Sequence, residues 1–148
     1  MRIFLITLSI LLTSIGSIMA KNLYNFSIQD IDGNTVNLDK FKGKPILLVN
    51  TASRCGFTKQ YANLSNLHRE YFEKNLVIIG TPSNSFHQEL SNNEEVKEFC
   101  LVNYETKFII SEIISVVGEN AHPIYSWMTS EYNDCLLYTS DAADDTPC

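Results

Sequence analysis

Polar and apolar residues alternate in two short stretches near the start of the folded region. The first stretch covers residues 24–28 and the second covers residues 36–38, with the turn-forming pair Asp32-Gly33 between them. Alternation with a period of two is typical of strands that have one buried face, and an Asp-Gly pair favours a tight turn. The pattern therefore predicts an N-terminal β-hairpin.

Two unbroken apolar runs follow, at residues 46–49 and 76–79. Short runs of this kind are typical of strands that are buried on both faces of a parallel sheet. Between them, residues 59–72 carry apolar side chains at spacings of three and four, which predicts a helix. We expect the second strand to end at Gly80 and the strand–helix–strand unit to have a right-handed crossover.

The sequence after residue 90 predicts two helices and one strand. Ser91–Glu94 has the pattern of a capping box and is expected to open a helix. The inner face of this helix is expected to comprise Val96, Phe99 and Cys100. Residues 108–110 are apolar enough for a third strand, and His122-Pro123 is typical of the start of a last helix. Together these elements predict an α/β fold.

Both ends of the chain differ from the region between them. Arg2 precedes an apolar run that reaches Ile18, and the small residue Ala20 follows, so residues 1–20 are typical of a secretory signal peptide. The alternative is an uncleaved membrane anchor, for which the run is short and rich in Ser and Thr. We therefore expect export to the periplasm or another extracytoplasmic site, without stable membrane insertion after cleavage.

Residues 135–148 show neither a helical nor a strand period. They resemble the translation of a sequencing-library adapter, which predicts a non-native tail; a disordered acidic tail is the alternative. The folded domain is accordingly expected to span residues 21–134. Its candidate cysteines are Cys55 and Cys100.

The charge balance excludes several classes of partner. The chain has 11 basic and 17 acidic residues, a formal net charge of −6. It contains no basic run of the kind that nucleic-acid binding requires, no glycine-rich phosphate loop and no Cys/His cluster with zinc spacing. We expect no nucleic-acid partner and no bound cofactor.

Cys55 is the candidate nucleophile. It follows the predicted strand at residues 46–49 and precedes the predicted helix at residues 59–72, and ligands of open α/β sheets bind at such strand ends. The amino end of a helix, together with the neighbouring Arg54, favours a thiolate, which is the reactive form of cysteine. A lone cysteine in this place is nevertheless more often an inert buried residue.

The residues around Cys55 distinguish between classes of thiol enzyme. A thioredoxin-type dithiol needs Cys-x-x-Cys, whereas this sequence has Thr58 at the last position. A peroxiredoxin normally places Thr three residues before its cysteine, whereas this sequence has Ala52 there.

Four ordered segments closely resemble the glutathione peroxidase family. Val49–Thr58 resembles the signature around the reactive residue, and Gly80–Glu89 resembles the second signature loop. Leu23–Gly33 and Gly118–Pro123 resemble the opening hairpin and a later segment. The resemblance implies a thioredoxin-like fold with an N-terminal β-hairpin and a central sheet flanked by helices. The family's C-terminal elements, with their Trp-Asn-Phe segment, are missing here, and Trp127 does not match that segment.

The resemblance also implies an activity. By position, Cys55 corresponds to the thiol that attacks the peroxide, and Gln88 corresponds to its hydrogen-bond partner. A thiol-dependent peroxidase of this kind reduces hydrogen peroxide or organic hydroperoxides through a sulfenic acid and serves in the response to oxidative stress. Ser83 and Ser85 depart from the Cys and Gln that are usual in the second signature loop.

Cys100 matches a position where some cysteine-type members carry a resolving cysteine. In that case it would condense with the Cys55 sulfenic acid, and a thioredoxin-like protein would reduce the resulting disulfide. Otherwise glutathione or another small thiol acts directly. The stripe that Cys100 forms with Val96 and Phe99 equally indicates a core residue, and bridging to Cys55 would require its helix to unwind locally.

Two other interpretations remain from the sequence. One is a thioredoxin-like thiol–disulfide oxidoreductase, which Thr58 disfavours. The other is an inactive truncated fragment, because a missing strand would leave an open sheet edge.

Overall fold

The computed structural model describes residues 22–131, and within them the predicted α/β architecture is confirmed. The predicted signal peptide and the predicted tail lie outside the described residues. In chain order the elements are η1 (Leu23–Asn25), β1 (Ser27–Gln29), β2 (Thr35–Asn37), η2 (Leu38–Phe41), β3 (Ile46–Thr51), α1 (Gln60–Tyr71), η3 (Phe72–Lys74), β4 (Val77–Pro82), α2 (Asn93–Tyr104), β5 (Ile109–Ile110) and α3 (Pro123–Glu131).

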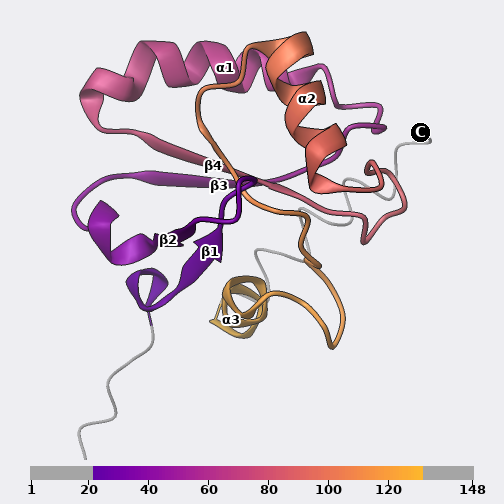
Figure 1. Cartoon of the computed structure of the whole chain (residues 1–148). Coiled ribbons are helices and arrows are strands. Elements are labelled where there is room, and N and C mark those ends of the chain that lie inside the picture. Colours follow the sequence, from indigo (N-terminus) through magenta and orange to yellow (C-terminus); the bar gives the residue numbers. More distant parts are fainter. Residues whose placement is uncertain (1–21, 132–148) are drawn as a thin grey trace, which may run out of the picture.

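A parallel sheet in the order β3-β4-β5 lies at the centre of the described region (Figure 1). Strands β3 and β4 pair over six residues, from Ile46 opposite Val77 to Thr51 opposite Pro82. The prediction that Gly80 ends the second strand is wrong, because the ladder with β3 continues through Gly80 to Pro82. Ile46–Val49 are only half-buried, since β3 forms one edge of this sheet in residues 22–131.

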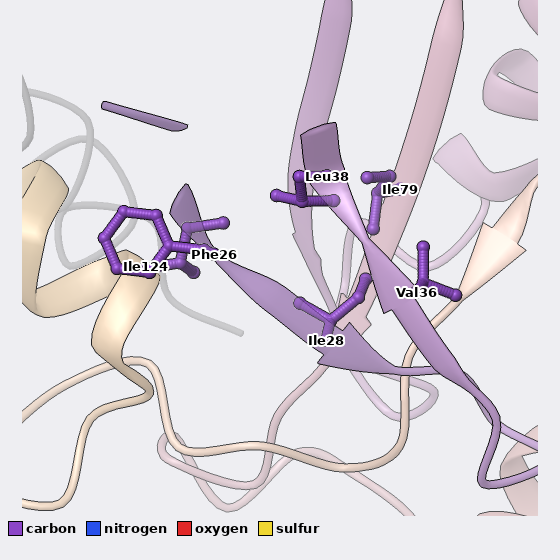
Figure 2. Close-up of a cluster of buried hydrophobic side chains, with 6 residues drawn as sticks. All are labelled: Phe26, Ile28, Val36, Leu38, Ile79 and Ile124. Carbon is purple, nitrogen blue, oxygen red and sulfur yellow. The ribbon is translucent and has the colours of Figure 1, made fainter. Parts of the chain in front are cut away.

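The two faces of the sheet are covered differently (Figure 1). Helices α1 and α2 lie over one face, and the β1–β2 hairpin and α3 lie over the other. Adjacent residues of a strand point to opposite faces, so Ile78 joins the core beneath α1 and α2, whereas Ile79 joins the core beside the hairpin. Figure 2 shows the second core, which consists of Phe26, Ile28, Val36, Leu38, Ile79 and Ile124.

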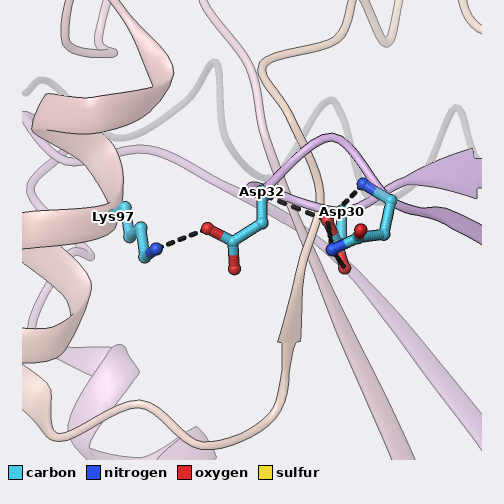
Figure 3. Close-up of polar contacts among 4 residues, drawn as sticks. Asp30, Asp32 and Lys97 are labelled. Carbon is cyan, nitrogen blue, oxygen red and sulfur yellow. Dashed lines mark hydrogen bonds and ion pairs between the residues drawn. The ribbon is translucent and has the colours of Figure 1, made fainter.

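The predicted hairpin is confirmed, with β1 and β2 antiparallel and Ile28 opposite Val36. Its strands are shorter than the alternation suggested, because the flanking residues form the 3-10 turns η1 and η2. The Asp30 carboxylate closes the turn by accepting hydrogen bonds from the backbone N–H groups of Asp32 and Asn34, at 3.0 and 2.8 Å (Figure 3). Lys97 of α2 forms an ion pair with Asp32, which joins this turn to the helix layer.

The hairpin also covers the outer edge of β5. The Ile31 N–H donates to the Ile110 carbonyl at 2.8 Å, and the Glu112 N–H donates to the Gln29 carbonyl at 3.0 Å. These bonds place the end of β1 beside β5 and cover the edge of this short strand.

The helices begin close to where the sequence predicts. The predicted start of α2 is confirmed, but the predicted capping box at Ser91–Glu94 is wrong. Asn92 is the N-cap and accepts the Glu95 N–H at 2.9 Å, whereas the Glu95 carboxylate returns to the Ser91 N–H and not to the Asn92 backbone N–H. Helix α3 starts at Pro123, with the preceding His122 Nδ1 accepting the Ile124 N–H at 3.3 Å. None of the helices in residues 22–131 has both the length and the apolar character needed to cross a membrane.

Gly80 is required by a close approach between strands. A methyl group at this position would lie 2.9 Å from Ile110 Cδ1 and 3.2 Å from Phe108 Cε2. We expect Gly80→Ala to lower the free energy of unfolding by about 1–3 kcal/mol, since these core side chains would have to move. Urea denaturation measures the change, with Gly56→Ala as the matched control because its surroundings are open. Equal losses in the two variants would contradict the explanation.

His122 makes the N-terminal cap of α3 sensitive to pH. Burial lowers its pKa, so the unfolded chain takes up the proton first as the pH falls through about 6.5. Its contribution to stability is complete above that pH and is lost below it, because a protonated Nδ1 cannot accept the Ile124 N–H.

We therefore expect His122→Asn, which caps without titrating, to lose less unfolding free energy than the parent between about pH 7.5 and pH 5.5. Denaturant titrations at both pH values measure this difference. His68, whose pKa burial also lowers, is present in both proteins and cancels in the comparison. Identical pH dependence in the two proteins would show that the cap does not titrate.

Candidate active site

Cys55 lies in the loop of residues 52–59 that joins β3 to α1, and its side chain is partly exposed. Thr58 fixes the loop from within. Its Oγ1 accepts the Cys55 N–H at 2.9 Å and lies 2.9 Å from the Ala52 carbonyl oxygen and 2.7 Å from that of Cys55. Thr58, which stands where a thioredoxin-type dithiol has its second cysteine, thus holds the backbone of the loop in place through its hydroxyl group.

The surroundings of the sulfur differ in detail from the prediction of a helix N-terminus. Helix α1 begins at Gln60, and the N–H groups of Gln60 and Tyr61 donate to the loop carbonyls of Phe57 and Thr58. The N–H group that points at Cys55 Sγ is that of Phe57, at 3.5 Å. The hydrogen-bond donor to the Cys55 sulfur is therefore the Phe57 N–H of the loop, which precedes the first turn of α1.

Gln88 lies in the loop after β4, which runs beside the Cys55 loop. Its backbone oxygen accepts the Arg54 N–H at 2.8 Å, so its main chain is one hydrogen bond from the residue that precedes Cys55. The loop reverses at His87, whose N–H donates to Asn84 O at 3.0 Å and whose φ of 59° is left-handed. The structure thus places the Cys55 and Gln88 loops side by side, and the predicted hydrogen bond between the Gln88 side chain and Cys55 stays a prediction.

Glu89 is a residue of this region that the sequence analysis did not single out. It is 4% exposed, and its Oε1 accepts the Ser53 N–H at 3.0 Å and the Leu90 N–H at 2.8 Å. A charged residue in a polar loop gives no sign of burial in a single sequence, since Glu is usually exposed. The available signal was its position next to Gln88 in the family-like segment.

The two serines that depart from the family pattern are built into a hydroxyl network. Ser83 is 1% exposed and bonds to Ser85 Oγ at 2.9 Å. Ser85 Oγ in turn accepts the Val116 N–H at 3.1 Å and lies 3.4 Å from Ser115 Oγ. The network ties the start of the Gln88 loop to the segment that leads into α3.

Cys100 is 1% exposed in α2 and belongs to the core between the helices and the sheet. Burial raises the pKa of its thiol to about 11, an effect that the nearby Tyr61 hydroxyl opposes. Burial also raises the pKa of Tyr61, whose hydroxyl lies beside Thr51 and Cys100 without reaching hydrogen-bonding geometry in residues 22–131. Cys55 and Cys100 are both free thiols.

A pocket of about 360 Å³ that Cys100 helps to line lies between α2, the hairpin turn and β5. Lys40, Lys97 and Lys107 are among the residues that line it, whereas Cys55 and Gln88 are not. The pocket is therefore separate from the Cys55 region. In residues 22–131 no group of three or more His, Cys, Asp and Glu side chains could hold a metal ion.

A parallel β–α–β unit with a partly exposed cysteine in the loop after its first strand is typical of the class of thioredoxin-fold thiol enzymes. A family model described as glutathione peroxidase matches residues 23–129. The chain belongs to the glutathione peroxidase family, which confirms the resemblance seen in its signature segments and the prediction of a thiol-dependent peroxidase.

Similar sequences support the same assignment. The chain is 40% identical over 119 residues to a glutathione peroxidase of Lactococcus lactis subsp. cremoris, covering 80% of this chain and 76% of that protein. It is 40% identical over 114 residues to glutathione peroxidase-like peroxiredoxin 2 of Saccharomyces cerevisiae, covering 76% of this chain and 70% of that protein.

Solved structures agree with the fold. The chain superposes on apo Trgpx with a TM-score of 0.57 and 33% identity, covering 76% of this chain and 66% of that one. It superposes on T. cruzi GPX1 with a TM-score of 0.57 and 29% identity, covering 76% of this chain and 67% of that one. The chain thus spans about two thirds of the length of these structures.

The contrast between the two cysteines predicts different reactivity. We expect iodoacetamide to alkylate Cys55 in the native protein at neutral pH, because its side chain is partly exposed. Cys100 is expected to react only after unfolding, because its thiol is buried and protonated. Peptide mapping by mass spectrometry with and without urea measures both, and equal native labelling would contradict the buried placement.

Proposed function

We propose that Cys55 is the thiol with which this chain reduces hydroperoxides. The observation that carries the proposal is the partly exposed Cys55 sulfur, met by the Phe57 N–H in the loop after β3, within a chain of the glutathione peroxidase family. The thiolate attacks one peroxide oxygen and the O–O bond breaks. Cys55 becomes a sulfenic acid, and the departing oxygen takes a proton and leaves as water or an alcohol.

Gln88 is proposed as the residue that stabilises the charge in this step. A side-chain amide can donate hydrogen bonds to the thiolate and to the departing oxygen. The backbone hydrogen bond between Gln88 and Arg54 supports this role, because it holds the two loops next to each other.

A thiol must then return Cys55 to its reduced form. The reductant condenses with the sulfenic acid, which forms a disulfide and releases water, and a second thiol breaks that disulfide by exchange. Glutathione and a thioredoxin-like protein are the proposed reductants. The Lactococcus relative is named a glutathione peroxidase and the yeast relative a peroxiredoxin, which supports a thiol donor of one of these two kinds.

Hydrogen peroxide and organic hydroperoxides are the proposed substrates. A Synechocystis relative, 40% identical over 109 residues, is named a hydroperoxy fatty acid reductase. The exposed rings of Phe57 and Phe86, from the Cys55 loop and the Gln88 loop, support a substrate with an apolar part. Export of the chain to a periplasmic or other extracytoplasmic site, directed by residues 1–20, completes the proposal.

Cys100 can act as the resolving cysteine only after α2 opens. The thiol is buried, and Thr106 holds this end of the helix with its N–H and its Oγ1, which donate to the Cys100 carbonyl at 3.3 and 2.9 Å. Because the Cys100 thiol must become accessible before it can condense with the Cys55 sulfenic acid, we expect that sulfenic acid to form before any Cys55–Cys100 disulfide.

The activity and the order of events can be tested together. Cys55→Ser is expected to abolish thiol-dependent hydroperoxide consumption, whereas the parent consumes it; an active Cys55→Ser protein would refute the proposal. For the order of events, one equivalent of peroxide is added to a Cys135→Ser/Cys148→Ser background and the products are followed by mass spectrometry. A Cys55 sulfenic acid that persists with Cys100 still reduced would assign reduction to an external thiol.

A further inference from the structure

Glu89 connects the two loops that carry the proposed catalytic residues. Its carboxylate accepts hydrogen bonds from the N–H groups of Ser53 and Leu90, so one oxygen serves the Cys55 loop and the Gln88 loop at once. Ser53 and Glu89 are 36 residues apart in sequence. The bond between them is therefore a tertiary contact that exists only when both loops are in place.

A second hydrogen bond between the two loops lies next to the Ser53–Glu89 bond. The Arg54 N–H donates to the Gln88 carbonyl at 2.8 Å, directly next to the Ser53–Glu89 bond. Two consecutive residues of one loop are thus joined to two consecutive residues of the other. Cys55 is the next residue on one side, and on the other the Gln88 side chain belongs to the residue whose carbonyl accepts the Arg54 N–H.

The environment of Glu89 is costly for a carboxylate without a specific role. The residue is 4% exposed, and in residues 22–131 its Oε2 is buried without a hydrogen-bond partner. A buried, partly satisfied carboxylate destabilises a fold unless its remaining bonds fix something in return. What its bonds fix here is the separation of the Cys55 and Gln88 loops.

We propose that Glu89 is a positioning residue for the peroxidase reaction: by binding the Ser53 N–H it sets the distance between Cys55 and Gln88. The inference rests on the proposed function, since it assigns Glu89 a role through Gln88. It requires a carboxylate or amide oxygen at the end of a two-methylene side chain, because a shorter side chain cannot reach Ser53 while its backbone stays in the loop.

A double-mutant cycle with Gln88 tests the proposal. Glu89→Ala is expected to reduce kcat/KM for hydrogen peroxide by about tenfold to a hundredfold, the size of loss that misplacement of a catalytic group produces. The double variant Glu89→Ala/Gln88→Ala is expected to be within about twofold of Gln88→Ala alone, because both changes remove the same interaction. Additive losses would overturn the proposal, as would full activity of Glu89→Ala.

Two further variants distinguish the loss of the positioning contact of Glu89 from a failure of the protein to fold. Glu89→Gln keeps an oxygen that can accept both N–H groups and is expected to retain activity within about threefold, whereas Glu89→Asp is expected to resemble Glu89→Ala. The Asp variant keeps the charge, so the proposal stays testable if the Ala variant fails to fold. Ser65→Ala, which removes a bond from another buried side chain to the Tyr104 carbonyl, is the matched control and is expected to be additive with Gln88→Ala.

A readout without peroxide separates failure of this inference from failure of the proposed function. The pH profile of Cys55 alkylation by iodoacetamide is expected to shift in the same direction in Glu89→Ala and in Gln88→Ala, because both lose the amide donor at the thiolate. An unshifted profile in Glu89→Ala beside a shifted one in Gln88→Ala would overturn the inference. A parent protein that consumes no hydroperoxide would overturn the proposed function, while the alkylation profiles would still decide the role of Glu89.

Discussion

The parallel pairing of β3 and β4 is the constraint on which the site depends. Six consecutive residue pairs, ending with Thr51 opposite Pro82, bring the carboxyl ends of both strands to the same edge of the sheet. The segments that leave this edge are the Cys55 loop and the Gln88 loop, which consequently start side by side. Their neighbouring positions follow from the direction of the strands, before any side chain in either loop makes a contact.

The packing of the sheet protects this register. Ile78 and Ile79 point into separate cores on the two faces, so a slip by one residue would exchange their environments. Gly80 allows Phe108 and Ile110 of the neighbouring segment to approach the backbone at the centre of the ladder. Thr81 then bonds through its Oγ1 to the Val49 carbonyl and to the Tyr125 hydroxyl, which anchors α3 to the end of β4. The strand ends are thus held from the helix face, the hairpin face and the neighbouring strands.

Much of this arrangement could be predicted from the sequence because it depends on periodic apolar patterns. The hairpin, the strand–helix–strand unit and the helix starts near Lys59 and His122 each leave a local signature. The extension of β4 to Pro82 could not be read locally, because Gly80 and Pro82 normally end strands and only the ladder with β3 keeps them in register. Tertiary pairing here outweighs local propensity.

The candidate site was predictable to a similar degree. Cys55 and Gln88 could be identified as candidates from family-like segments, and the same resemblance paired them. Glu89 could not, since burial of a carboxylate is a property of the assembled loops and not of its neighbours in sequence. Only part of the role of Thr58 could be predicted. Its identity disfavoured a Cys-x-x-Cys dithiol, whereas its hydrogen bonds to the Cys55 backbone are seen only in the folded loop.

The burial of Cys100 affects the rate at which a Cys55–Cys100 disulfide could form and how that rate depends on temperature. A disulfide between two sulfurs that already face each other forms at a rate set by bond-making alone. A disulfide that needs α2 to open instead inherits the energetics of local unfolding, with a large activation enthalpy and a steep rise on warming. In the proposed two-cysteine cycle, a Cys55 sulfenic acid would stay exposed to a second peroxide molecule, and so to irreversible over-oxidation, until the helix opens. In that cycle the local stability of α2 would set how long the sulfenic acid must survive.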